Sequence, residues 1–113
     1  KEFVELAALP SYLARQLVSL QSDLLERARR LRDENTFRVG SYAEFQTGID
    51  QSGGFFIAPW CESRECETRV KNETKATIRC LPLGPDHEPI AESGGCMVCG
   101  KGPGVRAIFA RSY

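Results

Sequence analysis

Apolar residues recur at steps of three and four through the first third of the chain, and this spacing predicts one long helix over residues 12–34. The apolar stripe of this helix comprises Leu13, Leu17, Leu20, Leu24, Ala28 and Leu31. Pro10 suits the first helical position because its missing N–H is not needed there. The residues before it, 1–6, are expected to form a short strand or a connector.

The next segment carries a helix start signal between two short strand candidates. Ser41 and Glu44 have the spacing of a capping box, in which each side chain accepts a hydrogen bond from the other residue's N–H. A short strand is predicted over residues 36–39. A short helix is therefore predicted to follow Ser41 and to end near Asp50. Residues 55–58 are continuously apolar, which is typical of a strand covered on both faces.

Helical and strand-like patterns alternate again in the last third of the chain. Residues 62–73 are polar with helical spacing, residues 76–81 alternate as a strand does, and residues 105–110 form a last strand. The alternation places Cys80 on the apolar face, where a thiol packs as a small buried group. Residues 81–104 contain few apolar side chains, so we expect a bound metal to hold this loop.

This order of elements predicts an α+β fold, in which about four strands form a small sheet with helices packed on one face. Residues 1–35 would form a connector with the long helix, and residues 36–113 a compact domain. A chain of 113 residues can bury a modest core. Because the sequence does not begin with Met, we expect it to be a fragment of a longer protein.

Composition and motif spacing argue against several functional classes for this chain. Fifteen basic and fifteen acidic residues cancel, so no net field indicates a nucleic acid or a membrane as partner. No apolar run approaches the ~20 residues that span a bilayer. The single histidine, His87, lies in a polar loop outside any ligand spacing, and residues 100–104 lack the spacing of a phosphate-binding loop.

Four of the five cysteines occur in pairs along the chain. Four residues separate Cys61 from Cys66, two separate Cys96 from Cys99, and 29 lie between the pairs. Two such pairs can supply the opposite edges of the tetrahedron that Zn²⁺ prefers. Cys66 would lie in the first turn of a helix, and Gly100 can make the sharp turn that follows the second pair. We therefore predict a structural Zn(Cys)4 site.

Two disulfides or four free thiols are the alternative interpretations of this pattern. The odd number of cysteines leaves Cys80 without an obvious partner, and the charged segment after residue 3 does not resemble a signal peptide. Both observations favour a cytoplasmic, reducing environment, in which paired cysteines more often bind a metal than each other.

Basic residues near the cysteines are candidates for a further role. The last 21 residues contain three cations and no Asp or Glu, whereas four thiolates and Zn²⁺ sum to a formal charge of about −2. The cations could offset this charge, or they could face RNA. The residues concerned are Arg64, Arg69, Lys101, Arg106 and Arg111.

Three stretches together resemble a known family. They are G-F-F-I-A-P-W-C-E-S-R-E-C-E-T-R-V-K-N-E-T-K-A-T-I-R-C-L-P, the later G-C-M-V-C-G, and the terminal F-A-R-S-Y. This combination resembles the C-terminal zinc-binding domain of prolyl-tRNA synthetases of the archaeal/eukaryotic type, including the bacterial enzymes that share it. The segments K-E-F-V-E-L-A-A-L-P and L-L-E-R-A-R-R-L-R-D-E-N-T resemble the family's exit from the anticodon-binding domain and its connecting helix.

The resemblance implies a two-layer α/β sandwich whose four cysteines, here Cys61, Cys66, Cys96 and Cys99, bind zinc. It also implies that the carboxylate of Tyr113 points toward the catalytic domain of the parent enzyme. The chain departs from the family pattern at Glu62, because a glycine commonly follows the first ligand cysteine. It also departs over residues 84–95, which do not match in length or sequence.

By the same resemblance, the parent is a class II ligase that activates proline with ATP and Mg²⁺ and charges tRNA(Pro), as a homodimer. The partners of this chain would be the catalytic and anticodon-binding domains and, through them, tRNA(Pro). No ATP-binding or proline-binding motif lies in these residues, so the fragment alone is not expected to be catalytic. Two alternatives of other classes are an autonomous zinc module that binds RNA or protein, and a redox enzyme that uses C-M-V-C. The latter leaves Cys61 and Cys66 unexplained.

Overall fold

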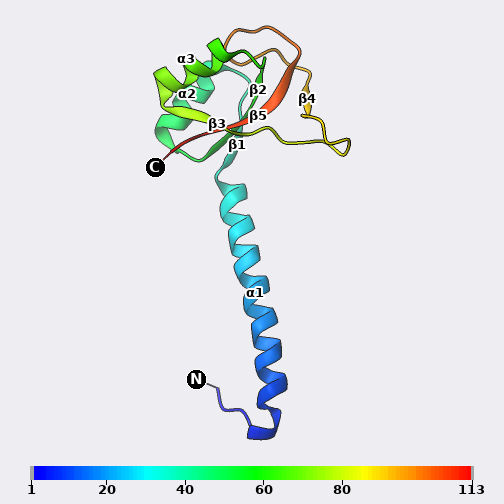
Figure 1. Ribbon diagram of the computed structural model, residues 1–113. Helices are drawn as coiled ribbons and strands as arrows, with labels where there is room; N and C mark the ends of the chain where they lie inside the picture. The colour runs from blue at the N-terminus through cyan, green and yellow to red at the C-terminus, as the bar shows by residue number, and fades with distance from the viewer. Residues whose placement is uncertain (1, 113) are drawn as a thin grey trace. The chain divides into compact units, whose positions relative to one another are not determined.

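The computed structural model describes residues 2–112, which divide into two compact units between Glu34 and Asn35. The first unit is one long helix, α1 (Leu9–Glu34), which follows a turn of 3-10 helix, η1 (Leu6–Ala8) (Figure 1). The helix begins three residues earlier than predicted, so that Pro10 is its second residue. Residues 2–5, before η1, form a connector and not a strand. Over residues 2–112, none of the helices is both long and apolar enough to cross a membrane.

The second unit is built on one mixed sheet of five strands, one more than the sequence predicted. The strands are β1 (Thr36–Arg38), β2 (Phe55–Trp60), β3 (Ala76–Cys80), β4 (Ala91–Glu92) and β5 (Gly104–Arg111). β1 and β2 pair in parallel, and β5 pairs in antiparallel fashion with β2 on one edge. β3 and β4 pair with successive halves of the other edge of β5, which makes β5 the central strand (Figure 1).

Two helices, α2 (Tyr42–Gln51) and α3 (Arg64–Thr74), cover one face of this sheet, as expected for a two-layer fold. α2 begins at the predicted capping box. The N–H of Glu44 donates to the hydroxyl of Ser41, and the N–H of Ser41 donates to the carboxylate of Glu44, both at 3.3 Å. These two bonds satisfy N–H groups that have no partner within the helix.

The core lies between the sheet and the two helices. Three phenylalanines, one from α2 and two from the central strands, are 1% exposed or less. The ring of Phe45 meets the ring of Phe56 edge-on at 5.5 Å between centroids, and the ring of Phe109 at 5.6 Å. Edge-to-face contacts of this kind contribute to stability beyond the burial of their area.

The apolar run at residues 55–58 is covered on one face only, and the prediction of two covered faces is wrong. Phe56 and Ala58 are 1% exposed, whereas Phe55 is 41% exposed. The strand therefore alternates as successive side chains of any strand do, and the helices pack on the face of Phe56. A continuous apolar run did not reveal which of its residues would face outward.

Cys80 is exposed, contrary to the prediction that it would be buried. The register of β3 against β5 shifts between Ile78, which pairs with Phe109, and Cys80, which pairs with Ile108. This β-bulge adds one residue to β3, so the alternation of faces that placed Cys80 inside does not continue past Ile78.

The segment between β3 and β5 is held partly by backbone hydrogen bonds, which the sequence did not indicate. β4 pairs with the start of β5, and the N–H of Arg106 donates to the carbonyl oxygen of Ile90 at 2.8 Å. Within the segment, the N–H of Ile90 donates to the carbonyl oxygen of Pro82 at 3.0 Å. The prediction that a metal must hold all of residues 81–104 is therefore too broad, because residues 90–92 pair with β5 and residues 82–90 are hydrogen-bonded to one another.

Candidate metal centre

The first cysteine pair lies where β2 passes into α3. Cys61 directly follows the last residue of β2, and Cys66 is the third residue of α3. The turn between them is made by Glu62, whose φ is 60°, and by Ser63, which is extended. The helix therefore begins at Arg64 and not at residue 62 as predicted, because a left-handed residue cannot continue a right-handed helix.

The second pair lies in a tight turn between β4 and β5. The N–H of Cys96 donates to the carbonyl oxygen of Lys101 at 2.7 Å. The N–H of Gly100 donates to the carbonyl oxygen of Cys96 at 2.8 Å. Gly100 has a φ of 72°, which confirms the predicted sharp turn after Cys99. Gly95 is required at the other end of the turn, because a Cβ there would lie 2.2 Å from the carbonyl oxygen of Gly100.

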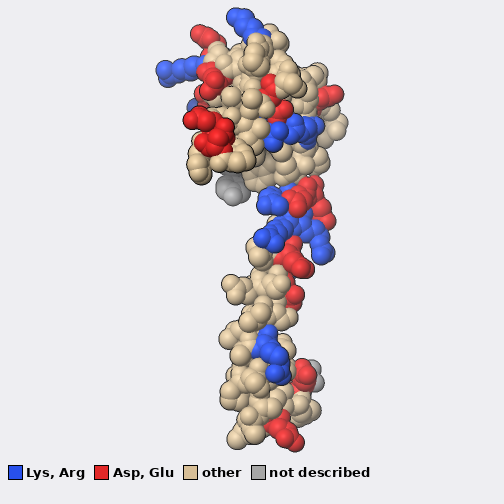
Figure 2. Space-filling view, turned by 90° about the vertical axis from the view of Figure 1, so that its right-hand side faces the viewer, with Lys and Arg blue, Asp and Glu red and all other residues tan. Residues whose placement is uncertain are grey.

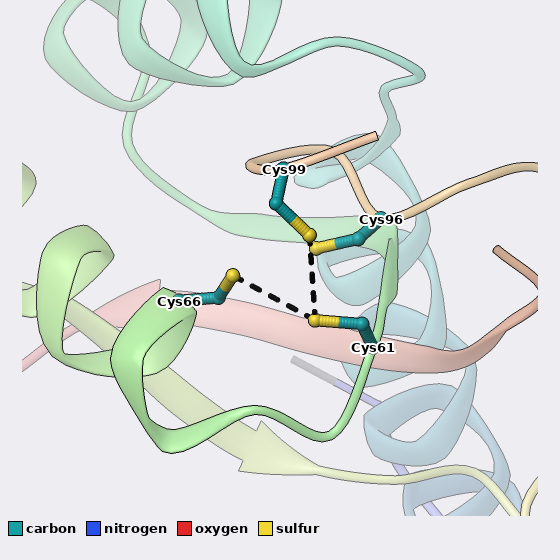
Figure 3. A group of neighbouring side chains, drawn as sticks. All are labelled: Cys61, Cys66, Cys96 and Cys99. Atoms are coloured by element: carbon teal, nitrogen blue, oxygen red, sulfur yellow. Dashed lines mark hydrogen bonds between the residues drawn. The ribbon is translucent and has the colours of Figure 1, made fainter. Parts of the chain in front are cut away.

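The two pairs converge, and their sulfur atoms point toward one another (Figure 3). All four Sγ atoms lie within 4.8 Å of one another, with Cys61 and Cys66 at 3.6 Å and Cys99 and Cys61 at 3.7 Å. Zn–S bonds of ~2.3 Å in a tetrahedron place sulfurs about 3.8 Å apart, so these separations fit a four-sulfur metal site. All five cysteines of the chain are free, and a disulfide needs sulfurs at ~2.05 Å. The structure therefore does not contain the two disulfides considered as an alternative.

The electrostatic environment differs across the cluster. Burial raises the pKa of the Cys66 thiol to about 12, and burial also raises the pKa of Cys61. The backbone N–H of Lys101, acting on the sulfur, lowers the pKa of Cys99 to about 7. A divalent cation supplies the positive charge that buried thiolates need, so the cluster is one that can hold a metal ion.

Three of the five basic candidates form ion pairs with carboxylates. Arg69 pairs with Glu73 at 2.9 Å and lies over the ring of Tyr42, and Arg106 pairs with Glu92 at 2.5 Å. Arg111 donates to the carbonyl oxygens of Ile49 and Thr74 and pairs with Asp50, at the ends of α2 and α3.

The other two basic candidates belong to the cysteine segments themselves. Arg64 begins α3, two residues before Cys66. The carbonyl oxygen of Lys101 accepts a hydrogen bond from the N–H of Cys96. The backbone N–H of Lys101 is hydrogen-bonded to the sulfur of Cys99. The structure therefore brings the backbone of Lys101 into the cluster, whereas the sequence indicated only a role for its side-chain charge.

Met97 is a residue of the centre that was not predicted from the sequence. It is 6% exposed and belongs to the core cluster, so the turn that carries two cysteines is anchored in the hydrophobic core. An apolar residue between two cysteines of an otherwise polar loop was the available signal. Cys80 and His87 lie outside the group of four cysteines, and Tyr113 lies outside the described residues.

Comparisons with known proteins agree on one family. The family described as "Prolyl-tRNA synthetase, C-terminal" matches residues 42–113. Over all 113 residues the chain is 42% identical to the proline–tRNA ligase of Bacteroides fragilis, 43% to that of Porphyromonas gingivalis and 42% to that of Rubrobacter xylanophilus. The chain spans 22% of the length of each of these relatives.

Solved structures give the same result. The crystal structure of prolyl-tRNA synthetase from Cryptosporidium parvum complexed with L-proline and AMP matches 97% of this chain, with a TM-score of 0.83 and 27% identity. The same enzyme complexed with halofuginone and AMPPNP matches with a TM-score of 0.82 and 30% identity. The chain covers 23% of each of these structures. The resemblance to prolyl-tRNA synthetases is thus confirmed at the level of the family, and the chain belongs to the family of prolyl-tRNA synthetase C-terminal domains.

Proposed function

We propose that this chain is the zinc-stabilised C-terminal part of a proline–tRNA ligase of the archaeal/eukaryotic type. Residues 36–113 form the zinc-binding domain, and residues 1–35 connect it to a preceding anticodon-binding domain. Cys61, Cys66, Cys96 and Cys99 are the ligands of one Zn²⁺. The observation that carries the proposal is the convergence of four sulfurs, from two segments 29 residues apart, within 4.8 Å.

The role of the metal is structural. Four cysteine ligands leave no open position at which Zn²⁺ could bind water or substrate. When bound, the ion would cross-link the start of α3 to the turn before β5. The residues of the chain supply the rest of the support: the backbone of Lys101 orients two of the sulfurs, and Met97 fixes their turn to the core.

The whole protein carries the activity. We propose that it activates proline with ATP and Mg²⁺, charges tRNA(Pro), and acts as a cytoplasmic homodimer, with its catalytic residues in the part that this chain does not include. Support comes from the relatives, which are proline–tRNA ligases of which the chain spans 22%. The purified chain alone should therefore show no proline-dependent exchange between ATP and pyrophosphate, and such exchange would contradict the proposal.

Native mass spectrometry of the intact chain tests the metal assignment. We expect one zinc ion per chain, lost in Cys96→Ser and kept in Cys80→Ala, because Cys80 lies outside the group of four. Cys80→Ala is a matched control, since it also removes one thiol. A mass equal to the metal-free chain at neutral pH, in the absence of chelator, would overturn the assignment.

Tyr113 is proposed to act on catalysis in the whole enzyme. Tyr113 follows β5 by two residues, so a strand that is fixed in the sheet limits how far its carboxylate can reach. Deletion of Ser112 and Tyr113 from the full-length protein should slow proline activation while zinc content stays at one per chain. Unchanged kinetics of proline activation would show that Tyr113 has no such role.

A further inference from the structure

The apolar face of α1 is exposed along its length. None of the 26 residues of this helix is buried. Four leucines of the stripe, Leu13, Leu17, Leu20 and Leu24, are 49–67% exposed. A helix of this kind normally gains most of its stability by packing an apolar face, which these leucines do not do within the described residues.

The face is broad. At 100° per residue, Val18 and Leu25 lie beside the leucine stripe and extend the apolar surface to about half of the helix circumference. Both are at least 50% exposed. Ser19 lies on the opposite side, whereas Ser22 lies at the edge of the face, one helical turn from Val18. An apolar face this wide is typical of a helix that packs on a globular surface, whereas two paired helices share a narrower seam.

We propose that this face, formed by Leu13, Leu17, Val18, Leu20, Leu24 and Leu25, docks on the part of the same polypeptide that lies outside these 113 residues. The proposal rests on the proposed function, in which the chain is one part of a longer ligase. The chain accounts for 22% of its bacterial relatives and 23% of the Cryptosporidium parvum enzyme, so more than three quarters of such a protein is available as the partner.

A second copy of α1 fits this face less well. In a heptad pattern that places Leu17 and Leu24 at one core position and Leu13 and Leu20 at the other, the next core position is Arg27. The uninterrupted seam from Leu13 to Leu24 is shorter than two heptads, and three or four are needed to indicate a coiled coil.

RNA is also a poor partner for the helix. Residues 26–34 contain four arginines and three carboxylates, and Figure 2 shows the two signs mixed along the C-terminal part of α1. Binding to a phosphate backbone is driven by cations that release counterions, and interspersed carboxylates oppose it. The apolar side chains, and not the charges, therefore define this surface.

Hydrogen exchange in the full-length protein tests the proposal. Amides of residues 9–34 should exchange at least about tenfold more slowly in the full-length protein than in the 113-residue chain, because docking prevents the helix from fraying. The double substitution Leu17→Glu and Leu24→Glu should remove this protection. The control, Ser19→Glu, adds a carboxylate on the opposite side and should leave it intact.

Three results would overturn the proposal. The first is equal exchange of residues 9–34 in both proteins, and the second is protection that survives Leu17→Glu with Leu24→Glu. The third is a 113-residue chain that sediments as a dimer with α1 protected, which would identify a second copy as the partner. Zinc content and charging of tRNA(Pro) by the full-length protein are measured in parallel. If charging is normal and α1 is unprotected, this inference fails and the proposed function stands.

Discussion

The backbone N–H of Met97 donates to the carbonyl oxygen of Pro59 at 3.0 Å. This bond joins the turn that carries Cys96 and Cys99 directly to the strand that ends before Cys61. The side chain of Met97 is buried in the core on the same turn. Hydrogen bonding and burial therefore position the second cysteine pair independently of any metal, and the metal would add a further link between segments that are already in contact.

Removal of the metal should loosen the cysteine turn selectively. Residues 93–101 have few backbone partners outside the turn itself, so we expect their amides to lose protection when a chelator is added. Residues 82–92 should keep most of theirs, since β4 and Ile90 are hydrogen-bonded to β5. Amide exchange with and without chelator measures both segments in one experiment.

Equal loss of protection in both segments would show that the metal holds the whole of residues 81–104. No loss in either would show that the metal is dispensable for the fold. Residues 105–110 of β5 serve as the internal reference, because this strand is paired on both edges.

Local signals in the sequence predicted the parts of this structure that depend on neighbouring residues. Ser41 and Glu44 gave the start of α2, and Gly100 gave the left-handed turn after Cys99, because each requires a particular side chain at a particular position. The convergence of the cysteine pairs followed from the ligand requirement of zinc, and the structure confirms that the four sulfurs lie together.

Features that depend on pairing between distant segments were not predicted. The bulge after Ile78 reverses the face of Cys80, and nothing in the alternation of β3 indicates it. β4 has only two residues, and it forms because the start of β5 offers a free edge. The outward orientation of Phe55 follows from the absence of a second helical layer among the described residues, which the run of apolar letters did not reveal.

Glu92 should stabilise the domain through two arginines. Its carboxylate pairs with Arg106 at 2.5 Å and with Arg38 at 3.1 Å. It therefore links β4 to β5, which carries Arg106, and to β1, which carries Arg38. Glu92→Gln should lower the free energy of unfolding by about 1–2 kcal/mol at pH 7, since hydrogen bonds to charged groups contribute on that scale. Glu88→Gln, in the same segment, is the control, because Glu88 forms no ion pair among the described residues.

The effect of Glu92 should depend on pH in a defined direction. The hydrogen bond from Arg106 lowers the pKa of Glu92 in the folded chain. The stabilisation is therefore complete above the unfolded pKa of ~4.3 and is lost as pH falls through the lower folded value. Denaturant unfolding of wild type and Glu92→Gln at pH 7 and near pH 3 should show a difference that shrinks at the lower pH. A difference that does not change with pH would mean that the ion pairs contribute nothing.

Glu62 is predicted to be a position where glycine is tolerated or favourable. Its φ of 60° costs a residue with a Cβ roughly 1 kcal/mol, and glycine adopts this conformation without the steric penalty. Glu62→Gly should leave the thermal midpoint unchanged or raise it, with zinc content unaltered. Glu65→Gly, three residues on and inside the first turn of α3, is the matched control and should destabilise by about 1 kcal/mol.

Arg111 is predicted to stabilise the fold rather than to balance the charge of the metal centre. Its guanidinium donates to the carbonyl oxygens of Ile49 and Thr74, in the last turns of α2 and α3, and it pairs with Asp50. Carbonyl groups at the end of a helix lack partners within it and carry the negative end of its dipole, so a planar cation suits them. Lysine keeps the charge but cannot donate in three fixed directions.

Arg111→Lys should therefore lower the free energy of unfolding by about 2 kcal/mol, measured by denaturant titration of the zinc-loaded chain. The control is Arg79→Lys, because Arg79 is bonded through one nitrogen to the hydroxyl of Ser112 and should cost much less. Zinc affinity, measured by competition with a chelator, separates the two roles. If Arg111 only balanced charge, Arg111→Lys would leave stability unchanged and Arg111→Gln would weaken zinc binding. If Arg111 instead holds the ends of α2 and α3 together, both substitutions should lower the free energy of unfolding. Zinc affinity, measured under folding conditions, should then stay within about twofold of wild type.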